Sequence, residues 1–209
     1  MGTIVKSFPA DTAEKKVKTT FLNDNKVDGL MYAYFQSLSK PFQLLDGGYE
    51  TRVDKAMLPS QEKAAKKIRI GTAKTWRSHL NILLNKGYIV DKGEYYVLPQ
   101  VEEIFFTIPL DTLKFMVDVL QEDVIKVYIY LGQRYKYAQS IGTLYSFTRK
   151  ELAQALGKSY SDGNREFIDH ALDCLMNNGL IRVVTYSDGK ARRLRLVKFN
   201  FEYIENLFD

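Results

Sequence analysis

Residues 80–89 read LNILLNKGYI, and residues 172–181 read LDCLMNNGLI. Both stretches fit the pattern L-x-x-L-ϕ-N-x-G-x-I, where ϕ is apolar, at an offset of 92 residues. Upstream of them, Trp76 aligns with Ile168 at the same offset. Because one local pattern recurs at a fixed spacing, we expect the chain of 209 residues to contain a duplicated structural unit.

The apolar residues of each copy predict a helix. They recur at i, i+4, i+7 and i+8, which is one face of an α-helix. The residues on this face are Trp76, Leu80, Leu83 and Leu84 in the first copy and Ile168, Leu172, Leu175 and Met176 in the second. Gly87 and Gly179 stand where a helix ends in the left-handed conformation, so each helix should stop there and lead into a strand.

Other elements are expected around these two helices. Lys92-Gly93 and Asp188-Gly189 separate apolar runs and therefore predict β-hairpins. Thr148 and Glu151 form a capping box for a helix that ends at Gly157. Further helices are predicted over residues 27–38, 60–68, 110–120 and 123–138, and apolar strands over residues 20–22 and 105–108.

The order helix, helix, turn, helix, hairpin thus occurs twice, over residues 25–98 and 110–199. This order resembles the winged helix, a helix-turn-helix followed by a β-wing. The fold class expected is mainly α with small β-hairpin wings (α+β), built as two tandem winged-helix domains. Because an acidic pair lies between Pro99 and Pro109, we predict a junction there and domains over residues 1–100 and 101–209.

The capping-box segment TRKELAQALG also resembles the second helix of many bacterial DNA-binding proteins. Tandem winged helices of this size resemble replication initiator or replisome-organiser proteins of plasmids and phages. That resemblance implies binding to repeated origin sites in double-stranded DNA and recruitment of host replication proteins. Two alternatives stay open: a transcriptional regulator that binds an operator, and a winged-helix module for protein–protein interaction.

Composition limits the possible classes. No stretch approaches 18 apolar residues, so no membrane-spanning segment is expected. The single cysteine, Cys174, excludes an internal disulfide framework, and we expect a cytoplasmic, reducing location. The net charge of +5 is uneven, because residues 1–100 carry 16 Lys+Arg against 10 Asp+Glu, whereas the remainder carries 14 against 15. The basic excess therefore favours a nucleic-acid partner for the first half.

The candidate DNA contacts lie at the start of the helix that carries Trp76 and just before it. In a helix-turn-helix, this part of the last helix meets base edges in the major groove. The candidates are Lys63, Lys66, Lys67, Arg69, Thr72, Lys74, Thr75, Arg77, Ser78 and Asn81. The alternative is an ordinary solvated helix face.

The second copy differs in charge. Its equivalent helix carries Glu166, Asp169 and Asp173, which repel phosphates, whereas its hairpin is basic. The candidates for backbone contact in this hairpin are Lys190, Arg192, Arg193 and Arg195. The alternative is a strand edge protected by charge. Contact through both surfaces would neutralise roughly 6–8 phosphates and make binding strongly salt-dependent.

No catalytic residue, metal site or cofactor is predicted, so we do not expect an enzyme. His170 and Cys174 are four residues apart on one helix, but no third group completes a nucleophilic or metal site. Gly157-Lys158-Ser159 ends like a P-loop but follows a helix instead of a strand. A homodimer is one possible use of the apolar faces of helices 110–120 and 123–138; the alternative is that they fill the core.

Overall fold

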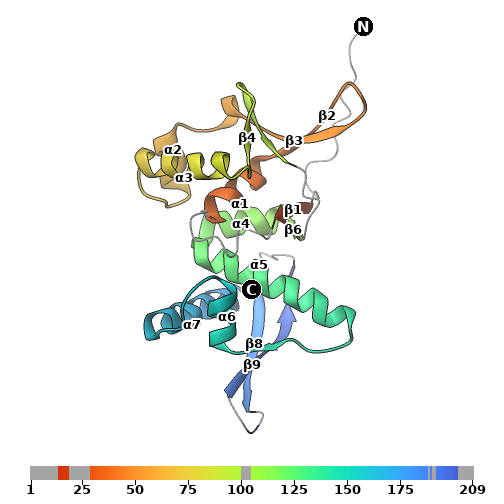
Figure 1. The fold of residues 1–209 in the computed structure, drawn as a ribbon, viewed down its shortest axis with the longest axis vertical. Coiled ribbons are helices and arrows are strands. Elements are labelled where there is room, and N and C mark those ends of the chain that lie inside the picture. The colour runs from red at the N-terminus through yellow and green to blue at the C-terminus, as the bar shows by residue number, and fades with distance from the viewer. Residues whose placement is uncertain (1–13, 19–28, 100–104, 188, 190–191, 202–209) are drawn as a thin grey trace, which may run out of the picture.

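The computed structural model describes residues 14–18, 29–99, 105–187, 189 and 192–201. Its fold is α+β. The described residues form seven α-helices and three small antiparallel sheets (Figure 1). The sequence prediction of a mainly helical chain with small hairpins is therefore confirmed at this level.

The first unit begins with helix α1 (Gly29–Leu38). A hairpin of β2 (Lys40–Gln43) and β3 (Tyr49–Asp54) follows, and a short 3-10 turn η2 (Lys55–Met57) leads to the next helices. These are α2 (Gln61–Lys67) and α3 (Ala73–Asn85), and the unit closes with β4 (Val90–Asp91) and β5 (Tyr95–Leu98). The four strands lie in the order β2-β3-β5-β4.

The second unit repeats this plan. Helices α4 (Leu110–Val119) and α5 (Glu122–Ser140) come first, and strand β7 (Ser146–Phe147) follows. Helices α6 (Arg149–Ala155) and α7 (Asp162–Asn177) precede the long hairpin of β8 (Ile181–Ser187) and β9 (Arg192–Phe199). The strand order β7-β9-β8 matches the order β3-β5-β4 of the first unit. The internal repeat in the sequence therefore corresponds to a repeat of topology.

Local signals define the helix ends as the sequence predicts. Thr148 and Glu151 make both hydrogen bonds of a capping box at the start of α6. Gly87 and Gly179 follow α3 and α7 with φ angles of 70° and 66°, a conformation that glycine adopts without a Cβ clash. At both ends, the second residue past the cap donates its N–H to a carbonyl five positions back, as Leu180 does to Leu175. The two helices thus end in the same way.

The core of the first unit is aromatic. Trp76 of α3 packs edge-on against Tyr34 of α1, at 5.9 Å between ring centroids, and lies 6.0 Å from Phe35. Phe35 in turn meets Tyr96 of β5 edge-on at 5.5 Å. Buried residues of the second unit join these in one contiguous cluster, since α4 and α5 both pack against α1. The apolar faces of helices 110–120 and 123–138 are therefore part of the core of this chain.

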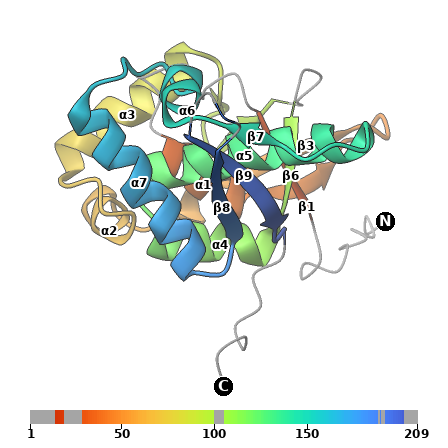
Figure 2. The ribbon, with the colours of Figure 1, turned by 90° about the horizontal axis from the view of Figure 1, so that it is seen from below.

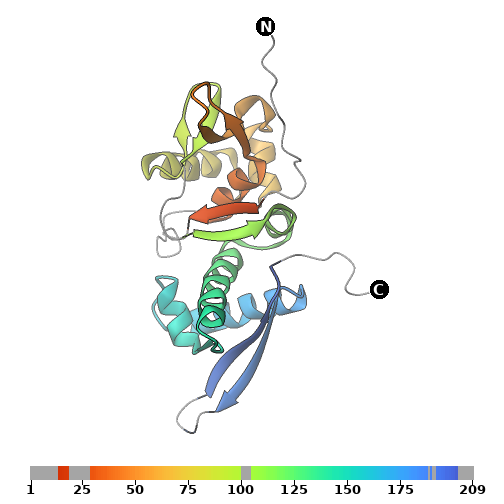
Figure 3. The same ribbon diagram turned by 90° about the vertical axis from the view of Figure 1, so that its right-hand side faces the viewer.

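The segment around the predicted junction contains a strand. Strand β6 (Phe105–Pro109) pairs antiparallel with β1 (Glu14–Lys18), so chain from near the start of the sequence lies beside the start of the second unit. Figure 3 shows this two-stranded sheet between the two units. The predicted strand over residues 20–22 falls outside the described residues. The division into domains 1–100 and 101–209 stays a prediction.

The β2–β3 hairpin was not predicted from the sequence. Its turn is the segment LLDGG, in which Leu44 and Gly48 are hydrogen-bonded through Leu44 N and Gly48 O at 2.8 Å, and Gly47 has a φ of 86°. Asp46-Gly47 is a hairpin signal of the same kind as those in the other two hairpins. The hairpin adds one strand, β2, to the arrangement of the second unit.

Candidate nucleic-acid interface

The predicted contact residues of α3 share one exposed face. Lys74, Arg77, Ser78 and Asn81 are all exposed and follow the spacing i, i+3, i+4 and i+7. The opposite face is buried in the core through Trp76, Leu80 and Leu83. Because the apolar side is fully used by packing, the polar side has to face outward. The structure therefore groups these four predicted residues on one surface.

Two threonines of the predicted set have a structural role at the start of α3. Thr72 is the N-cap residue, and its hydroxyl oxygen accepts a hydrogen bond from the Thr75 backbone N–H at 3.3 Å. The two side-chain oxygens also lie 3.2 Å apart. Such a cap satisfies backbone donors that the first turn of a helix leaves unpaired. These threonines hold the first turn, and Thr72 is exposed beside Lys74.

The lysines of α2 extend this basic surface. Lys63, Lys66 and Lys67 are exposed and fall at i, i+3 and i+4, on one side of the helix. The ammonium of Lys66 lies 3.2 Å from the Glu62 carboxylate, a solvated pair on the same helix. Lys67 Nζ lies 5.8 Å from the centre of the Tyr34 ring. We name the exposed groups of α2 and α3 together the α2–α3 basic surface: Lys63, Lys66, Lys67, Thr72, Lys74, Arg77, Ser78 and Asn81.

Arg69 is exposed like its neighbours, but its guanidinium is hydrogen-bonded within the chain, so its assignment as a DNA contact stays a prediction and we leave it out of this surface. Its guanidinium donates hydrogen bonds to the backbone carbonyl oxygens of Val117, Asp118 and Leu120 at the end of α4. The bond from Nη2 to the Leu120 oxygen is 2.7 Å long and that to the Val117 oxygen is 3.0 Å. With its donors engaged inside the chain, this arginine fixes a contact between the two units.

The basic hairpin of the second unit is also less available than its sequence indicates. Only Arg192 is exposed among the three arginines on β9 that the sequence singled out. Arg193 lies 3.4 Å from a Glu151 carboxylate oxygen. Arg195 stacks its guanidinium 4.2 Å from the centre of the Tyr186 ring, and its Nε is buried. Lys190 lies outside the described residues.

The pKa of the Tyr186 hydroxyl is lowered by groups around this hairpin. A hydrogen bond with Ser146 lowers the pKa of the Tyr186 hydroxyl, and the neighbouring cations Arg195 and Arg193 lower it further. Arg193 and Arg195 therefore lie close enough to Tyr186 to act on its hydroxyl. Arg192 is the exposed arginine of this hairpin.

The same positions of α7 carry the opposite charge. At the offset of 92 residues, Lys74 corresponds to Glu166, Arg77 to Asp169 and Asn81 to Asp173. Asp169 is ion-paired with Arg149 of α6, and Glu166 and Asp173 are exposed. Figures 1 and 2 show the α2–α3 and α6–α7 pairs on the same side of the molecule. The exposed face of α3 is therefore basic, and the equivalent face of α7 is acidic.

One arginine of the first sheet was not among the contacts predicted from the sequence. Arg52 of β3 lies between two rings, with its guanidinium carbon 3.6 Å from the centre of Phe42 and 4.2 Å from that of Tyr95. It also forms an ion pair with Glu50. These side chains meet because β2 pairs with β3 and β3 pairs with β5. The Asp46-Gly47 turn that joins β2 to β3 was not predicted from the sequence.

Cys174 and Lys158, which belong to the two motifs considered for enzymatic or metal chemistry, contact other side chains of the chain. Cys174 Sγ lies 3.6 Å from His170 Nε2, as their helical spacing predicts. Lys158 of the P-loop-like segment contacts the Asp123 carboxylate at 3.3 Å. Within the described ranges, no group of three or more His, Cys, Asp or Glu side chains could hold a metal ion. No helix in those ranges is both long and apolar enough to cross a bilayer.

Comparison with known proteins returned no match, whether with family models, curated proteins or solved structures.

Proposed function

We propose that this chain is a non-catalytic double-stranded DNA-binding protein made of two tandem winged-helix units. The observation that carries the proposal is the exposed face of α3, with Lys74, Arg77, Ser78 and Asn81 in helical register. Both units contain the order helix, strand, two helices and two strands, with one extra strand, β2, in the first unit, and this order supports the winged-helix assignment. In such units the last helix enters the major groove.

The chemistry of the α2–α3 basic surface suits a division of roles. Arg77 and Lys74 can donate to the O6 and N7 acceptors of guanine, and Asn81 can pair with adenine or with a phosphate. Lys63 and Lys67 on α2 suit phosphate contacts, which position a protein on DNA without reading its sequence. Arg192 on the second hairpin suits a further phosphate.

The biological role that the family resemblance implies is replication initiation of a plasmid or phage through origin sites. Host replication proteins would then be partners, and a homodimer would suit paired sites. Operator binding by a transcriptional regulator is the alternative. Sites that cluster as several repeats support the first role, whereas a single site at a promoter supports the second.

A fluorescence anisotropy titration with labelled duplex DNA tests the proposal. The bound sequence is first selected from random duplexes, and affinity is then measured for that site and for an unrelated duplex. The double variant Lys74→Ala, Arg77→Ala should lower affinity for the selected site far more than for the unrelated duplex. The matched control Lys114→Ala, Lys150→Ala removes two exposed cations from α4 and α6 and should leave both affinities nearly unchanged.

Two outcomes oppose the proposal. Equal losses on both duplexes would remove sequence reading from α3 and leave only phosphate contact. Absence of any salt-sensitive binding would favour the second candidate function, a protein–protein interaction module. The observation that favours an interaction module is the acidic face of α7, where Glu166 and Asp173 stand in place of the basic and polar residues of α3.

A further inference from the structure

Arg69 has an unusual backbone conformation. Its φ of 57° lies in the left-handed region, and among the described residues it is the one non-glycine with a positive φ. It follows α2 as Gly157 follows α6, where φ is 69°. At both sites this residue donates its N–H to the carbonyl three positions back, and the next residue donates to the carbonyl five positions back. The two turns are thus equivalent, and glycine is the residue that ordinarily suits them.

The side chain of Arg69 explains why arginine stands there. Its guanidinium reaches the carbonyl oxygens of Val117, Asp118 and Leu120, which form the end of α4. These carbonyls have no partner further along their own helix, and the end of a helix carries partial negative charge. A planar, permanently charged group with several donors in a fixed fork matches such a set; lysine keeps the charge but lacks the planar fork, and glycine has neither. Glycine would suit the backbone but would lose this contact.

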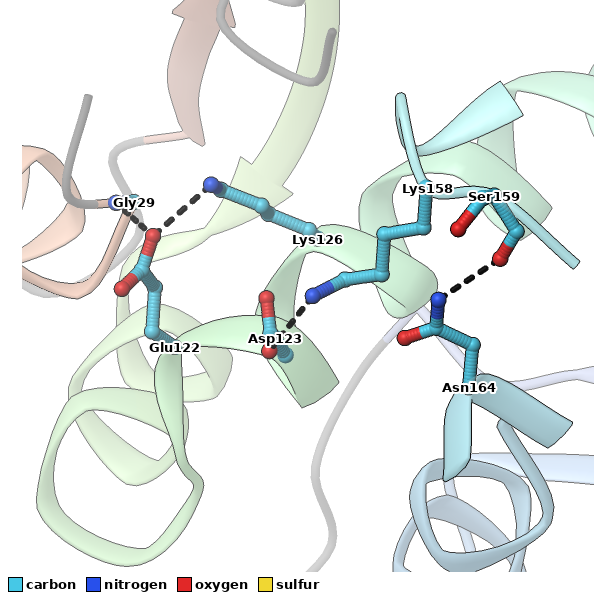
Figure 4. Close-up of polar contacts among 7 residues, drawn as sticks. All are labelled: Gly29, Glu122, Asp123, Lys126, Lys158, Ser159 and Asn164. Carbon is cyan, nitrogen blue, oxygen red and sulfur yellow. Dashed lines mark hydrogen bonds and ion pairs between the residues drawn. The ribbon is translucent and has the colours of Figure 1, made fainter. Parts of the chain in front are cut away.

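The first turn of α5, which follows this contact, makes polar contacts with two other parts of the chain. Figure 4 shows that consecutive carboxylates in the first turn of α5 serve different neighbours. Glu122 accepts a hydrogen bond from the Gly29 N–H at the start of α1 (3.2 Å) and pairs with the buried Lys126 (2.7 Å). Asp123 pairs instead with Lys158 in the turn between α6 and α7.

We propose that residues 117–126, the α4–α5 corner, position the DNA-reading helix α3 relative to the second unit, with Arg69 as the positioning residue. Arg69 precedes Thr72, the N-cap of α3, by three residues, so the place of α3 follows the place of this turn. Lys158 precedes Ser161, the N-cap of α7, by the same number. The corner therefore contacts the α2–α3 turn through Arg69 and the α6–α7 turn through Lys158. The DNA consequence rests on the proposed function, whereas the geometric claim does not.

Spin-label distances test the geometric claim without DNA. Labels are placed at Asn85→Cys and Asn177→Cys, the exposed last residues of α3 and α7, in a Cys174→Ser background. Arg69→Gly keeps the backbone conformation acceptable and removes the guanidinium. It should broaden or shift the distance distribution, whereas Arg77→Ala, which removes an exposed arginine from α3, should not.

A folded Arg69→Gly protein with the wild-type distribution would overturn the geometric claim. Thermal melting of each variant confirms that the distances come from folded protein. If Arg69→Gly melts below the temperature of measurement, Arg69→Lys replaces it under the same two outcomes, because it keeps the charge and loses the planar fork.

Binding measurements test the consequence for DNA reading. Arg69→Gly should lower the ratio of affinities for the selected site and an unrelated duplex about tenfold, the effect of losing one base contact. Affinity for the unrelated duplex should stay nearly unchanged, because the exposed lysines remain. An equal loss on both duplexes would make Arg69 a phosphate contact and refute its positioning role. If the chain binds no duplex at all, the proposed function fails and the distance measurement alone decides the geometric claim.

Discussion

Raising the salt concentration should weaken DNA binding by an amount that the structure sets. Each phosphate neutralised by a protein cation releases condensed counterions, so affinity falls with salt in proportion to the number of contacts. The sequence places many cations near α3 and on the β8–β9 hairpin of the second unit. In the structure, Arg69, Arg193 and Arg195 are engaged within the chain, and Lys66 is paired with Glu62.

With Arg69 set aside, five predicted cations are exposed without a carboxylate partner in the part of the chain that the structure describes: Lys63, Lys67, Lys74, Arg77 and Arg192. At about −0.9 per contact, five contacts give a slope of about −4.5 for the logarithm of affinity against the logarithm of salt concentration. Between about 50 and 200 mM salt, affinity should therefore fall roughly 500-fold. This is a weaker dependence than the roughly 6–8 contacts inferred from sequence would give.

Anisotropy titrations at five or more salt concentrations on one duplex measure this slope. Removal of Lys74 and Arg77 together should reduce its magnitude by about 1.8. A slope near zero would refute DNA binding through this surface. A slope steeper than about −7 would refute the assignment of Arg69, Arg193 and Arg195 to contacts within the chain.

Three further predictions concern folding. Gly179→Ala should lower the free energy of unfolding by about 1 kcal/mol in urea titrations, because φ is 66° there and space for a Cβ is open; an unchanged midpoint would contradict this. Thr148→Ala should cost about 1 kcal/mol by the same measurement through loss of the capping box, and a neutral result would deny the cap a role. The hydrogen bond from Lys55 holds the pKa of Asp91 below its usual value in the folded chain. The Asp91 carboxylate therefore stabilises the fold at pH values above the pKa that Asp91 has in the unfolded chain. This stabilisation is lost as the pH falls through the lowered pKa of the folded state. Urea titrations across pH should therefore show Asp91→Asn less stable than wild type near neutral pH and equal to it in acid, and a constant difference would argue against the pair.

Local features of the fold could be predicted well. Helix periodicity, the capping box at Thr148 and the glycines after α3 and α7 depend on residues within a few positions of one another. The exposed face of α3 follows from the same periodicity, since placing Trp76 and Leu80 in the core directs Lys74 and Arg77 outward. The basic surface is therefore visible in the sequence.

Long-range features could not be predicted. The pairing of β1 with β6 joins segments about ninety residues apart, and no local pattern specifies that register. The β2–β3 hairpin had a local signal in Asp46-Gly47, but its partner strand β5 lies across two helices. The stacking of Arg52 between Phe42 and Tyr95 depends on that pairing.

By itself, the sequence determined that two similar units exist and that the exposed face of α3 is basic, because helical periodicity is a local property. Only the tertiary structure decided which cations are available to a partner. Arg69 looks like its basic neighbours in the sequence, yet its guanidinium lies at the end of α4, some fifty residues away. The physical reason is that a long cationic side chain binds whichever acceptors the folded chain brings within its reach, and those acceptors are set by packing between distant segments.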